Sequence, residues 1–168
     1  MNQNDDALRR QRFDSILDES RDRMGRIARV YGGSEAEDLL QEIMMQIWRS
    51  LPSYDQKSKI STWCYRIALN TAISWKRNKA RSKRQPPKNR LTTDSLESQT
   101  SFSDEGKLLQ RFLESLSEID RAVLLMYLDD LTTREIAESM GASSGAIRTR
   151  ISRVRDRLGN WEATDGKS

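Results

Sequence analysis

Residues 131–158 of this chain read LTTREIAESMGASSGAIRTRISRVRDRL, and this stretch decides the fold of the C-terminal part. Thr132 with Glu135 three residues later forms a capping-box pattern, which predicts the start of a short helix. Gly141 is expected in the turn that follows, since glycine commonly lies just past a helix end. From about residue 144 to residue 158, apolar residues recur at helical spacing. A short helix, a glycine turn and a second amphipathic helix are typical of a helix-turn-helix.

The second of these helices carries polar and cationic residues on the faces that its apolar stripe leaves exposed. The residues expected to pack the two helices together are Ile136, Ala137, Ile147 and Ile151. Those expected to project outward to a DNA groove are Arg148, Thr149, Ser152 and Arg153. Many helical hairpins contain a glycine turn, and most surface arginines only contact solvent, so a solvated helix surface remains the alternative reading.

A second cationic segment lies further toward the N-terminus. From Gln56 to Thr93 the chain has eleven Lys or Arg residues and no Asp or Glu, while acidic residues are dense on both sides. A block this one-sided predicts contact with a polyanion, for which phosphate backbones are the usual candidates. The alternative is a solvated face or a disordered tail. Apolar residues in the first half of the block, such as Trp63 and Ile67, argue against that alternative.

The composition of the chain favours an all-α fold and excludes several classes of enzyme. Among 168 residues there are three prolines and eight glycines, and few runs alternate between apolar and polar residues. One cysteine and no histidine exclude an internal disulfide, a zinc site and a His-based catalytic triad. We therefore expect no metal, no cofactor and no catalysed reaction.

No part of the sequence resembles a signal peptide or a membrane span. The longest uncharged apolar stretch, Ala122 to Leu128, is far too short to cross a bilayer, and the N-terminal residues are polar. We therefore expect a cytoplasmic protein without direct membrane insertion.

Helical patterns also precede the helix-turn-helix. They are predicted over residues 6–31, from a second capping-box pattern at Ser34 and Glu37 to Pro52, and over residues 60–81, 108–116 and 119–128. Residues 82–106 are rich in Ser and Thr, contain two adjacent prolines and show no sustained periodicity, so they predict a flexible linker. The expected architecture is all-α, with a helical domain at 1–81 and a helix-turn-helix domain at 107–168.

Three runs in this order resemble a known family. AEDLLQEIMMQIWRSLPSYD from Ala36, STWCYRIALNTAISWKRNKAR from Ser61 and LLMYLDDLTTREIAESMGASSGAIRTRISRVRDRL from Leu124 are similar to regions 2 and 4 of the extracytoplasmic-function sigma factors of bacterial RNA polymerase. A stand-alone repressor would need only the last run. The resemblance implies a subunit that binds core polymerase, directs it to promoters with two elements and helps to melt the DNA.

For the first domain, the resemblance implies two partners. The polar face of residues 36–51 would bind the clamp helices of the polymerase's largest subunit through Asp38, Gln41, Glu42 and Arg49, with the apolar residues between them forming core. The connector and the following helix would capture a base flipped from the non-template strand of the minus-ten element. The residues that the resemblance assigns to this element are Tyr54, Gln56, Lys57, Ser58, Lys59, Ser61, Arg66, Asn70, Lys76 and Arg77. Trp63 and Trp75 are better interpreted as core, and Asn70 has the alternative of a hydrogen bond on its own helix.

For the second domain, the resemblance implies contact with the minus-thirty-five element and with the flap region of the polymerase. The residues assigned to DNA are Thr132, Ser143, Ser144, Arg148, Thr149, Ser152 and Arg153. Arg150, Arg155 and Arg157 are expected to touch phosphate, a partner protein or solvent. Two positions depart from the family pattern. Cys64 replaces a common Leu and is expected to pack as a small apolar group. Met126 replaces a basic residue of some members, which puts one phosphate contact in doubt.

The family also implies an anti-sigma partner, often membrane-anchored, which would hold the chain inactive and at the inner membrane face. Two other functions remain as alternatives. One is a stand-alone helix-turn-helix regulator that acts without polymerase. The other is a sigma-like decoy that binds only an anti-sigma factor, although such a decoy would not need the cationic segment.

Overall fold

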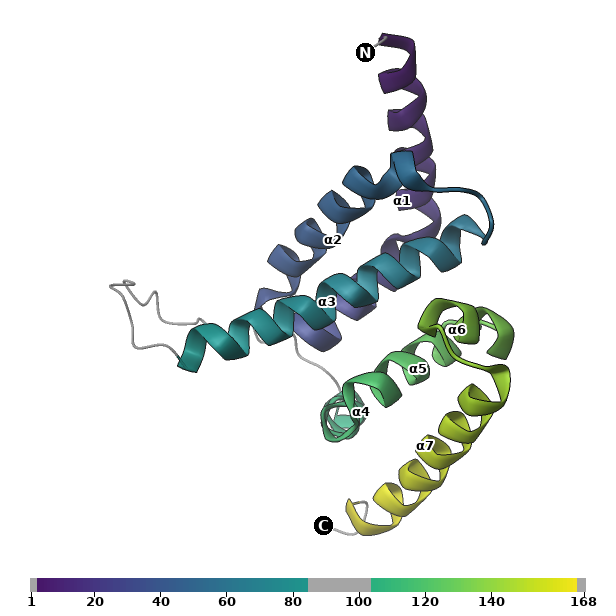
Figure 1. The fold of residues 1–168 in the computed structure, drawn as a ribbon. Coiled ribbons are helices and arrows are strands. Elements are labelled where there is room, and N and C mark those ends of the chain that lie inside the picture. Colours follow the sequence, from purple (N-terminus) through teal and green to yellow (C-terminus); the bar gives the residue numbers. More distant parts are fainter. Residues whose placement is uncertain (1–2, 85–103, 166–168) are drawn as a thin grey trace. The chain divides into compact units, whose positions relative to one another are not determined.

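The computed structural model describes residues 3–84 and 104–165, and every regular element in these residues is helical (Figure 1). The all-α prediction is therefore confirmed. The elements are α1 (Gln3–Gly32), the 3-10 turn η1 (Gly33–Glu35), α2 (Ala36–Ser50), the 3-10 turn η2 (Leu51–Ser53), α3 (Ile60–Arg84), α4 (Asp104–Ser115), α5 (Glu118–Leu128), α6 (Thr133–Met140) and α7 (Ser144–Asp165).

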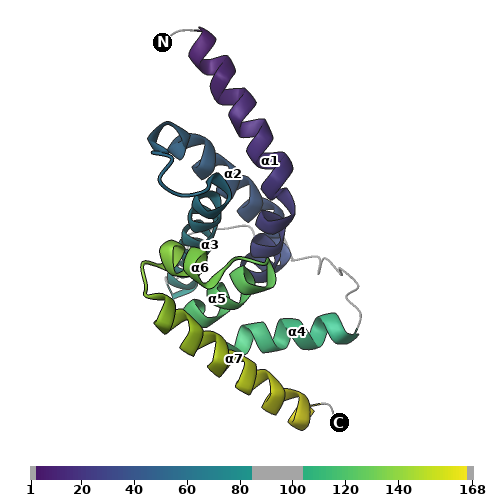
Figure 2. The same ribbon diagram turned by 90° about the vertical axis from the view of Figure 1, so that its right-hand side faces the viewer.

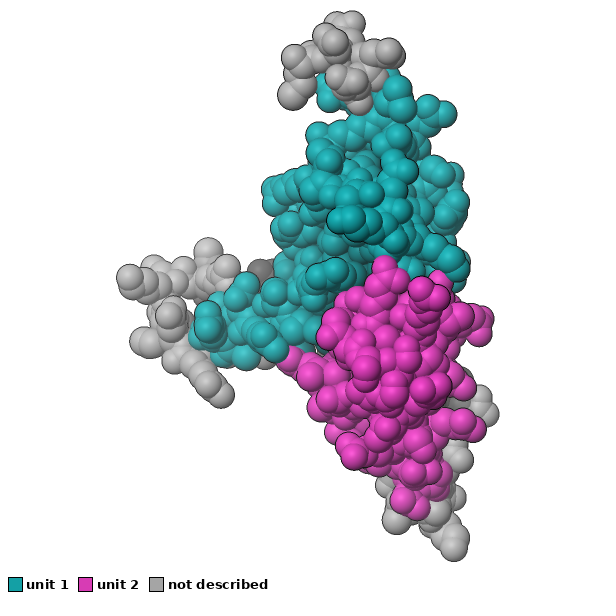
Figure 3. Space-filling model, turned by 45° about the vertical axis from the view of Figure 1, so that its right-hand side comes forward, with its two compact units in different colours: residues 1–99 teal, residues 100–168 magenta. Residues whose placement is uncertain are grey.

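The chain divides into two compact units, residues 1–99 and 100–168 (Figure 3). Helix α3 continues three residues into the segment predicted as a linker, and α4 begins three residues before its predicted end. Ser82, Lys83 and Arg84 extend α3 because nothing in them opposes helix; Pro86 and Pro87 follow only later in the sequence. The rest of the predicted linker, 85–103, lies outside the described residues.

In the first unit, α1, α2 and α3 pack against one another (Figures 1 and 2). The stripe that recurs every four residues on α2, Leu39, Ile43 and Ile47, is completely buried. It meets Met24 and Ile27 of the α1 core and the small residues of α3. Burying each of the large aliphatic side chains contributes about 1.5 to 3 kcal/mol, so this stripe fixes which face of α2 remains outside.

The turn between α1 and α2 differs from the prediction. Ser34 and Glu37 do not form a capping box, because η1 leads directly from α1 into α2 and Glu35 becomes the N-cap residue, without a side-chain hydrogen bond. Gly33 makes this turn possible with a φ of 56°, a value that glycine adopts without strain. The Glu35 carboxylate instead forms an ion pair with Lys79 of α3.

In the second unit, α5 is the central helix, with six consecutive buried residues from Arg121 to Met126. Helix α6 begins with the predicted capping box of Thr132 and Glu135 and ends at Gly141, whose φ is 62°. Both predictions are confirmed. Helix α7 continues to Asp165, beyond the predicted end at Leu158, and the Trp161 ring packs edge-on against Phe112, with 5.8 Å between ring centroids.

One buried cation holds the α4–α5 corner of this unit. Arg121 is only 3% exposed, and its guanidinium donates hydrogen bonds to the carbonyl oxygens of Leu113 at 2.7 Å, Glu114 at 3.0 Å and Leu116 at 3.3 Å. These carbonyls belong to the end of α4 and the turn after it, where helical partners run out. Arg121 therefore closes the end of α4 from within α5.

Replacing Arg121 by Met should destabilise the second unit by about 2 to 4 kcal/mol, because it leaves buried carbonyls without donors. Hydrogen exchange of the α4–α7 amides measures this effect separately from the first unit. Arg111→Met, at an exposed position of α4, is the control and should leave exchange unchanged. Equal protection in both variants would contradict the role assigned to Arg121.

Candidate nucleic-acid interface

Helix α3 separates a core face from an exposed polar face. Cys64, Ala68 and Ala72 are buried, whereas Arg66, Asn70 and Arg77 are exposed on the opposite side. Lys59 and Lys76 are also exposed, and no acidic residue occurs in α3. Since the side chains at positions 66, 70 and 77 recur at helical spacing, they form one cationic and polar stripe along the helix. The exposed position of Asn70 matches its predicted role, which needs a side chain directed away from the core.

The connector before α3 is folded onto itself. The Tyr54 hydroxyl donates to the carbonyl oxygen of Ser58 at 2.6 Å, and the Asp55 carboxylate accepts from the backbone N–H of Lys57 at 3.2 Å and pairs with its Nζ at 2.9 Å. Gln56 lies at the tip with a φ of 60°. Gln56, Lys57 and Lys59 are exposed, whereas Tyr54, Ser58 and Ser61 are half-buried. The loop is thus preformed, with Gln56 and the two lysines presented outward.

Two titrating side chains of the loop are shifted by these contacts. Hydrogen bonds from Lys57 hold the pKa of Asp55 below its ordinary value. Burial, with smaller contributions from Cys64 and Asp55, raises the pKa of Tyr54, so its hydroxyl keeps the proton that it donates to Ser58.

The loop and the far end of α3 do not form one pocket. Along a helix rising about 1.5 Å per residue, Asn70 lies about 15 Å from the start of α3 and Arg77 about 25 Å from it. The ten residues predicted for the minus-ten element therefore follow a path along the unit. Such a path suits an extended strand of nucleic acid better than a single bound base.

The aromatic residues of this region lie at the edge of the core. Trp63 is half-buried, and its ring packs against Tyr54 with 5.1 Å between centroids, so the prediction that Trp63 is a core residue is only partly correct. Trp75 is half-buried as well. The reason is that α3 packs its small residues inward against α1 and α2, which leaves the indoles at the boundary.

The outer face of α2 carries the residues predicted to bind polymerase. Asp38, Gln41 and Arg49 are exposed, and Glu42 is half-buried and accepts a hydrogen bond from Gln46 at 2.7 Å. Met45 lies on the same face and is 45% exposed. Sequence reasoning missed it, although its position, three residues after Glu42 and four before Arg49, follows the spacing of the polar face. An exposed apolar side chain within a polar stripe is typical of a protein contact.

In the second unit, α7 directs its five arginines to different places. Arg148 and Arg153 are exposed with Thr149 and Ser152, as predicted. Arg150 instead pairs with Asp120 of α5 at 2.8 Å, and Arg157 donates to the carbonyl oxygen of Ser115 at 3.2 Å. Arg150 and Arg157 therefore have partners within their own unit, which the prediction of phosphate, partner protein or solvent did not include.

Asp120 is held in its charged form by this packing. Partial burial raises the pKa of its carboxyl, but hydrogen bonds from Ser117 and Arg150 outweigh that effect, and the pKa lies below its ordinary value. The Arg150 pair thus remains charged at neutral pH and links α7 to α5.

Three predicted DNA residues serve as helix caps or lie beside them. The Thr132 hydroxyl accepts from the backbone N–H of Glu135, and the Ser143 hydroxyl accepts from that of Ala146 at 3.2 Å, at the start of α7. Ser144 is half-buried. Met126, in contrast, is fully buried, so it makes no phosphate contact and the doubt about that position is resolved.

The chain matches two described families along its length. Residues 17–82 match Sigma-70 region 2, and residues 106–158 match Sigma-70, region 4. The ECF RNA polymerase sigma-E factor of Escherichia coli strain K12 is 31% identical over 153 residues, which cover 80% of this chain and 77% of that protein. The chain belongs to the ECF RNA polymerase sigma factors. The ECF RNA polymerase sigma factor SigW of Bacillus subtilis strain 168 is 28% identical, over 87% of this chain and 86% of that protein.

Two solved structures support the fold of this ECF sigma factor. A chain in the complex of the sigma factor RpoE with the anti-sigma factor NepR from Bartonella quintana matches 93% of this chain and 97% of its own length, with a TM-score of 0.67 and 23% identity. The complex of CnrH with the cytosolic domain of CnrY gives a TM-score of 0.70 at 20% identity, over 93% and 90%. Within residues 3–84 and 104–165, no helix of this sigma factor combines the length and apolarity needed to cross a membrane.

Cys64 allows a test of the packing behind α3. Its thiol is buried, and burial, with a smaller effect from Glu19, raises the pKa to about 12. We expect a thiol reagent such as Ellman's reagent to label the native chain very slowly and the chain in denaturant at once, since the thiolate is the reactive form. Because the folded pKa exceeds the ordinary value of 9.0, this group stabilises the fold fully below pH 9, and that stabilisation is lost toward pH 12. Fast labelling of the native chain at pH 8 would contradict the buried position.

Proposed function

We propose that this ECF sigma factor binds core RNA polymerase, directs it to promoters that contain two elements and helps to open the DNA at the upstream edge of the transcription bubble. The observation that carries the proposal is the presence of both sigma regions in one chain. A stand-alone helix-turn-helix regulator would need only the second, and a decoy would not need an acid-free cationic stripe on α3. The chain acts as an initiation factor and catalyses no reaction itself.

Core polymerase would bind the outer face of α2. The residues proposed for this contact are Asp38, Gln41, Glu42, Arg49 and, in addition, Met45. The buried stripe of Leu39, Ile43 and Ile47 directs this face away from the unit's own core. The polar residues would give the contact its charge complementarity, and Met45 would supply buried apolar area at its centre.

The minus-ten element would meet the loop before α3 and the exposed stripe of α3. A flipped base needs groups that pair with its edges, and Gln56 and Asn70 provide amides that can do so. The backbone of an opened strand needs cations along its path, and Lys57, Lys59 and Arg66 provide them, followed by Lys76 and Arg77. The preformed loop lowers the entropy cost of this capture.

The minus-thirty-five element would meet the exposed face of α7. Arg148 and Arg153 flank Thr149 and Ser152 on this face, which suits the major groove of duplex DNA. Thr132, Ser143 and Ser144 lie at helix starts, where backbone N–H groups can contact phosphate. Arg150 and Arg157 would hold α7 in place through their contacts with Asp120 and Ser115.

An anti-sigma factor would control the chain by covering these surfaces in the cytoplasm, and a membrane-anchored one would keep it at the inner face of the membrane. This proposal is supported by the two similar structures, in which RpoE is bound to the anti-sigma factor NepR and CnrH to the cytosolic domain of CnrY.

The function is tested by adding the chain to core polymerase and mapping the transcripts that it initiates across a bacterial genome. We expect transcripts that share a two-element promoter. Arg148→Ala should cost about 1 to 3 kcal/mol of discrimination at one position of the minus-thirty-five element, and Asn70→Ala should reduce opening at the minus-ten element. Unchanged promoter choice and opening in both variants would refute the residue assignments. The absence of any transcript with the native chain would refute the function.

Met45→Glu should weaken binding to core polymerase by on the order of 10-fold, because it places a charge where apolar area is buried. Leu8→Glu is a matched control, since Leu8 is 49% exposed in the same unit but lies outside the α2 face. Binding is measured with fluorescently labelled chain and purified core enzyme. An equal loss in both variants would point to a general effect of added charge and contradict the role of Met45.

A further inference from the structure

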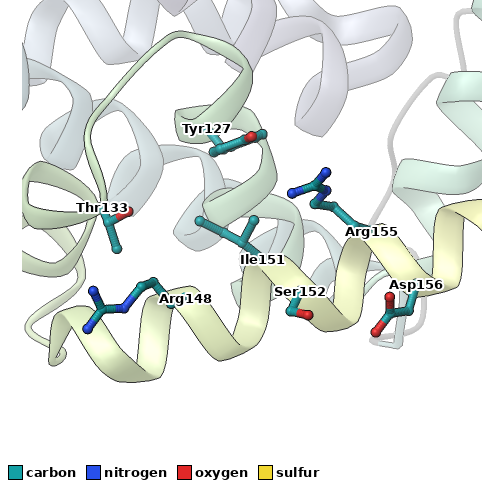
Figure 4. Close-up of a pocket in the computed structure, with 7 residues that line it drawn as sticks. All are labelled: Tyr127, Thr133, Arg148, Ile151, Ser152, Arg155 and Asp156. Carbon is teal, nitrogen blue, oxygen red and sulfur yellow. The ribbon is translucent and has the colours of Figure 1, made fainter.

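A groove of roughly 520 Å³ runs beside α7 in the second unit (Figure 4). Its lining comes from the end of α5 at Tyr127, the start of α6 at Thr133 and several residues of α7. Two of these, Arg148 and Ser152, also belong to the exposed face proposed to read DNA. The groove is therefore continuous with that face but extends past it, toward α5.

The groove is cationic at both ends. Arg148 and Arg155 are seven residues apart on α7, which places them on the same side of the helix, about 10 Å apart along its axis. Ile151 lies between them, and the hydroxyl groups of Thr133 and Tyr127 line the facing wall. In Figure 4, Arg155 extends on the side of α7 that faces Tyr127, whereas Asp156 extends on the other side. The one acidic lining residue thus leaves the arginines as the charges that face the interior.

Tyr127 is presented to this groove by the packing of α5. Met126, directly before it, is fully buried, while Tyr127 is 43% exposed. A tyrosine exposed at a helix end beside an arginine combines an aromatic wall, a hydroxyl donor and a positive charge. These groups suit a phosphodiester, whose oxygens accept hydrogen bonds and whose charge is negative.

We propose that the groove seats backbone phosphates of the duplex at the minus-thirty-five element, with the Arg155 guanidinium and the Tyr127 hydroxyl as DNA contacts additional to the residues of the exposed α7 face. The inference rests on the proposed function, since it requires that α7 meets duplex DNA. DNA is favoured over an acidic protein segment because the groove shares Arg148 and Ser152 with the base-reading face. A duplex read by that face brings one of its strands alongside the groove.

The test uses holoenzyme assembled from core polymerase and the full chain, bound to a duplex that carries the minus-thirty-five element defined by transcript mapping. Arg155→Ala should weaken binding by on the order of 10-fold, equally across sequence variants of the element. It should also lower the slope of log affinity against log salt by about 0.9, since one phosphate contact is lost. Tyr127→Phe should weaken binding to a smaller extent with the salt slope unchanged. Arg111→Ala, an exposed arginine of α4 outside the groove, is the matched control and should change neither quantity.

Neutral phosphates identify the contact directly. Scanning single methylphosphonate substitutions along the duplex should reveal a position that weakens binding of the native holoenzyme but has no further effect on Arg155→Ala. The proposal is overturned if affinity and salt slope are unchanged in both groove variants. It is also overturned if Arg155→Ala weakens only the binding of core polymerase, which would assign the groove to a protein segment. Native holoenzyme that fails to transcribe from any promoter would refute the proposed function instead, and that result is distinguishable because it precedes any variant.

Discussion

The charges of α3 and α7 must remain in water or meet a partner, while the opposite face of each helix forms part of a core. This constraint determines what both units present. In α3, small residues such as Ala68 and Ala72 pack inward and the cationic stripe lies outside. In α7, Ile147 and Val154 are buried, and Arg148 and Arg153 are left outside. Because an unpaired buried charge is costly, the core and the nucleic-acid surface are two sides of the same helices.

A few charged side chains work in the opposite way and hold the helices together. Arg121 binds the carbonyls at the end of α4, and Arg150 ties α7 to Asp120 of α5. In the first unit, Lys79 joins α3 to Glu35 in the turn before α2. These contacts set the positions of the helices that carry the exposed faces. The DNA-reading residues of α7 therefore depend on a polar framework that itself does not face DNA.

Local patterns predicted the parts of the fold that local interactions control. The capping box at Thr132 and the left-handed Gly141 were confirmed, because each depends on residues within one turn of it. The same pattern at Ser34 failed, because a 3-10 turn already joined α1 to α2 and left no free helix start for Ser34 to cap. The extension of α7 was missed, since it is anchored by Trp161 against Phe112, nearly fifty residues away in the chain.

The sequence by itself determined the helical class, the core stripes and the family, because these follow from periodicity and from runs of residues read in order. It also placed Asn70 and Arg148 on outward faces. Only the tertiary structure decided which arginines of α7 are available, since Arg150 and Arg157 differ from Arg148 and Arg153 in what packs beside them. It likewise exposed Met45 on α2 and brought Tyr127 beside Arg155. Periodicity gives the direction of a side chain from its helix axis, but the neighbour that it meets comes from a distant part of the chain.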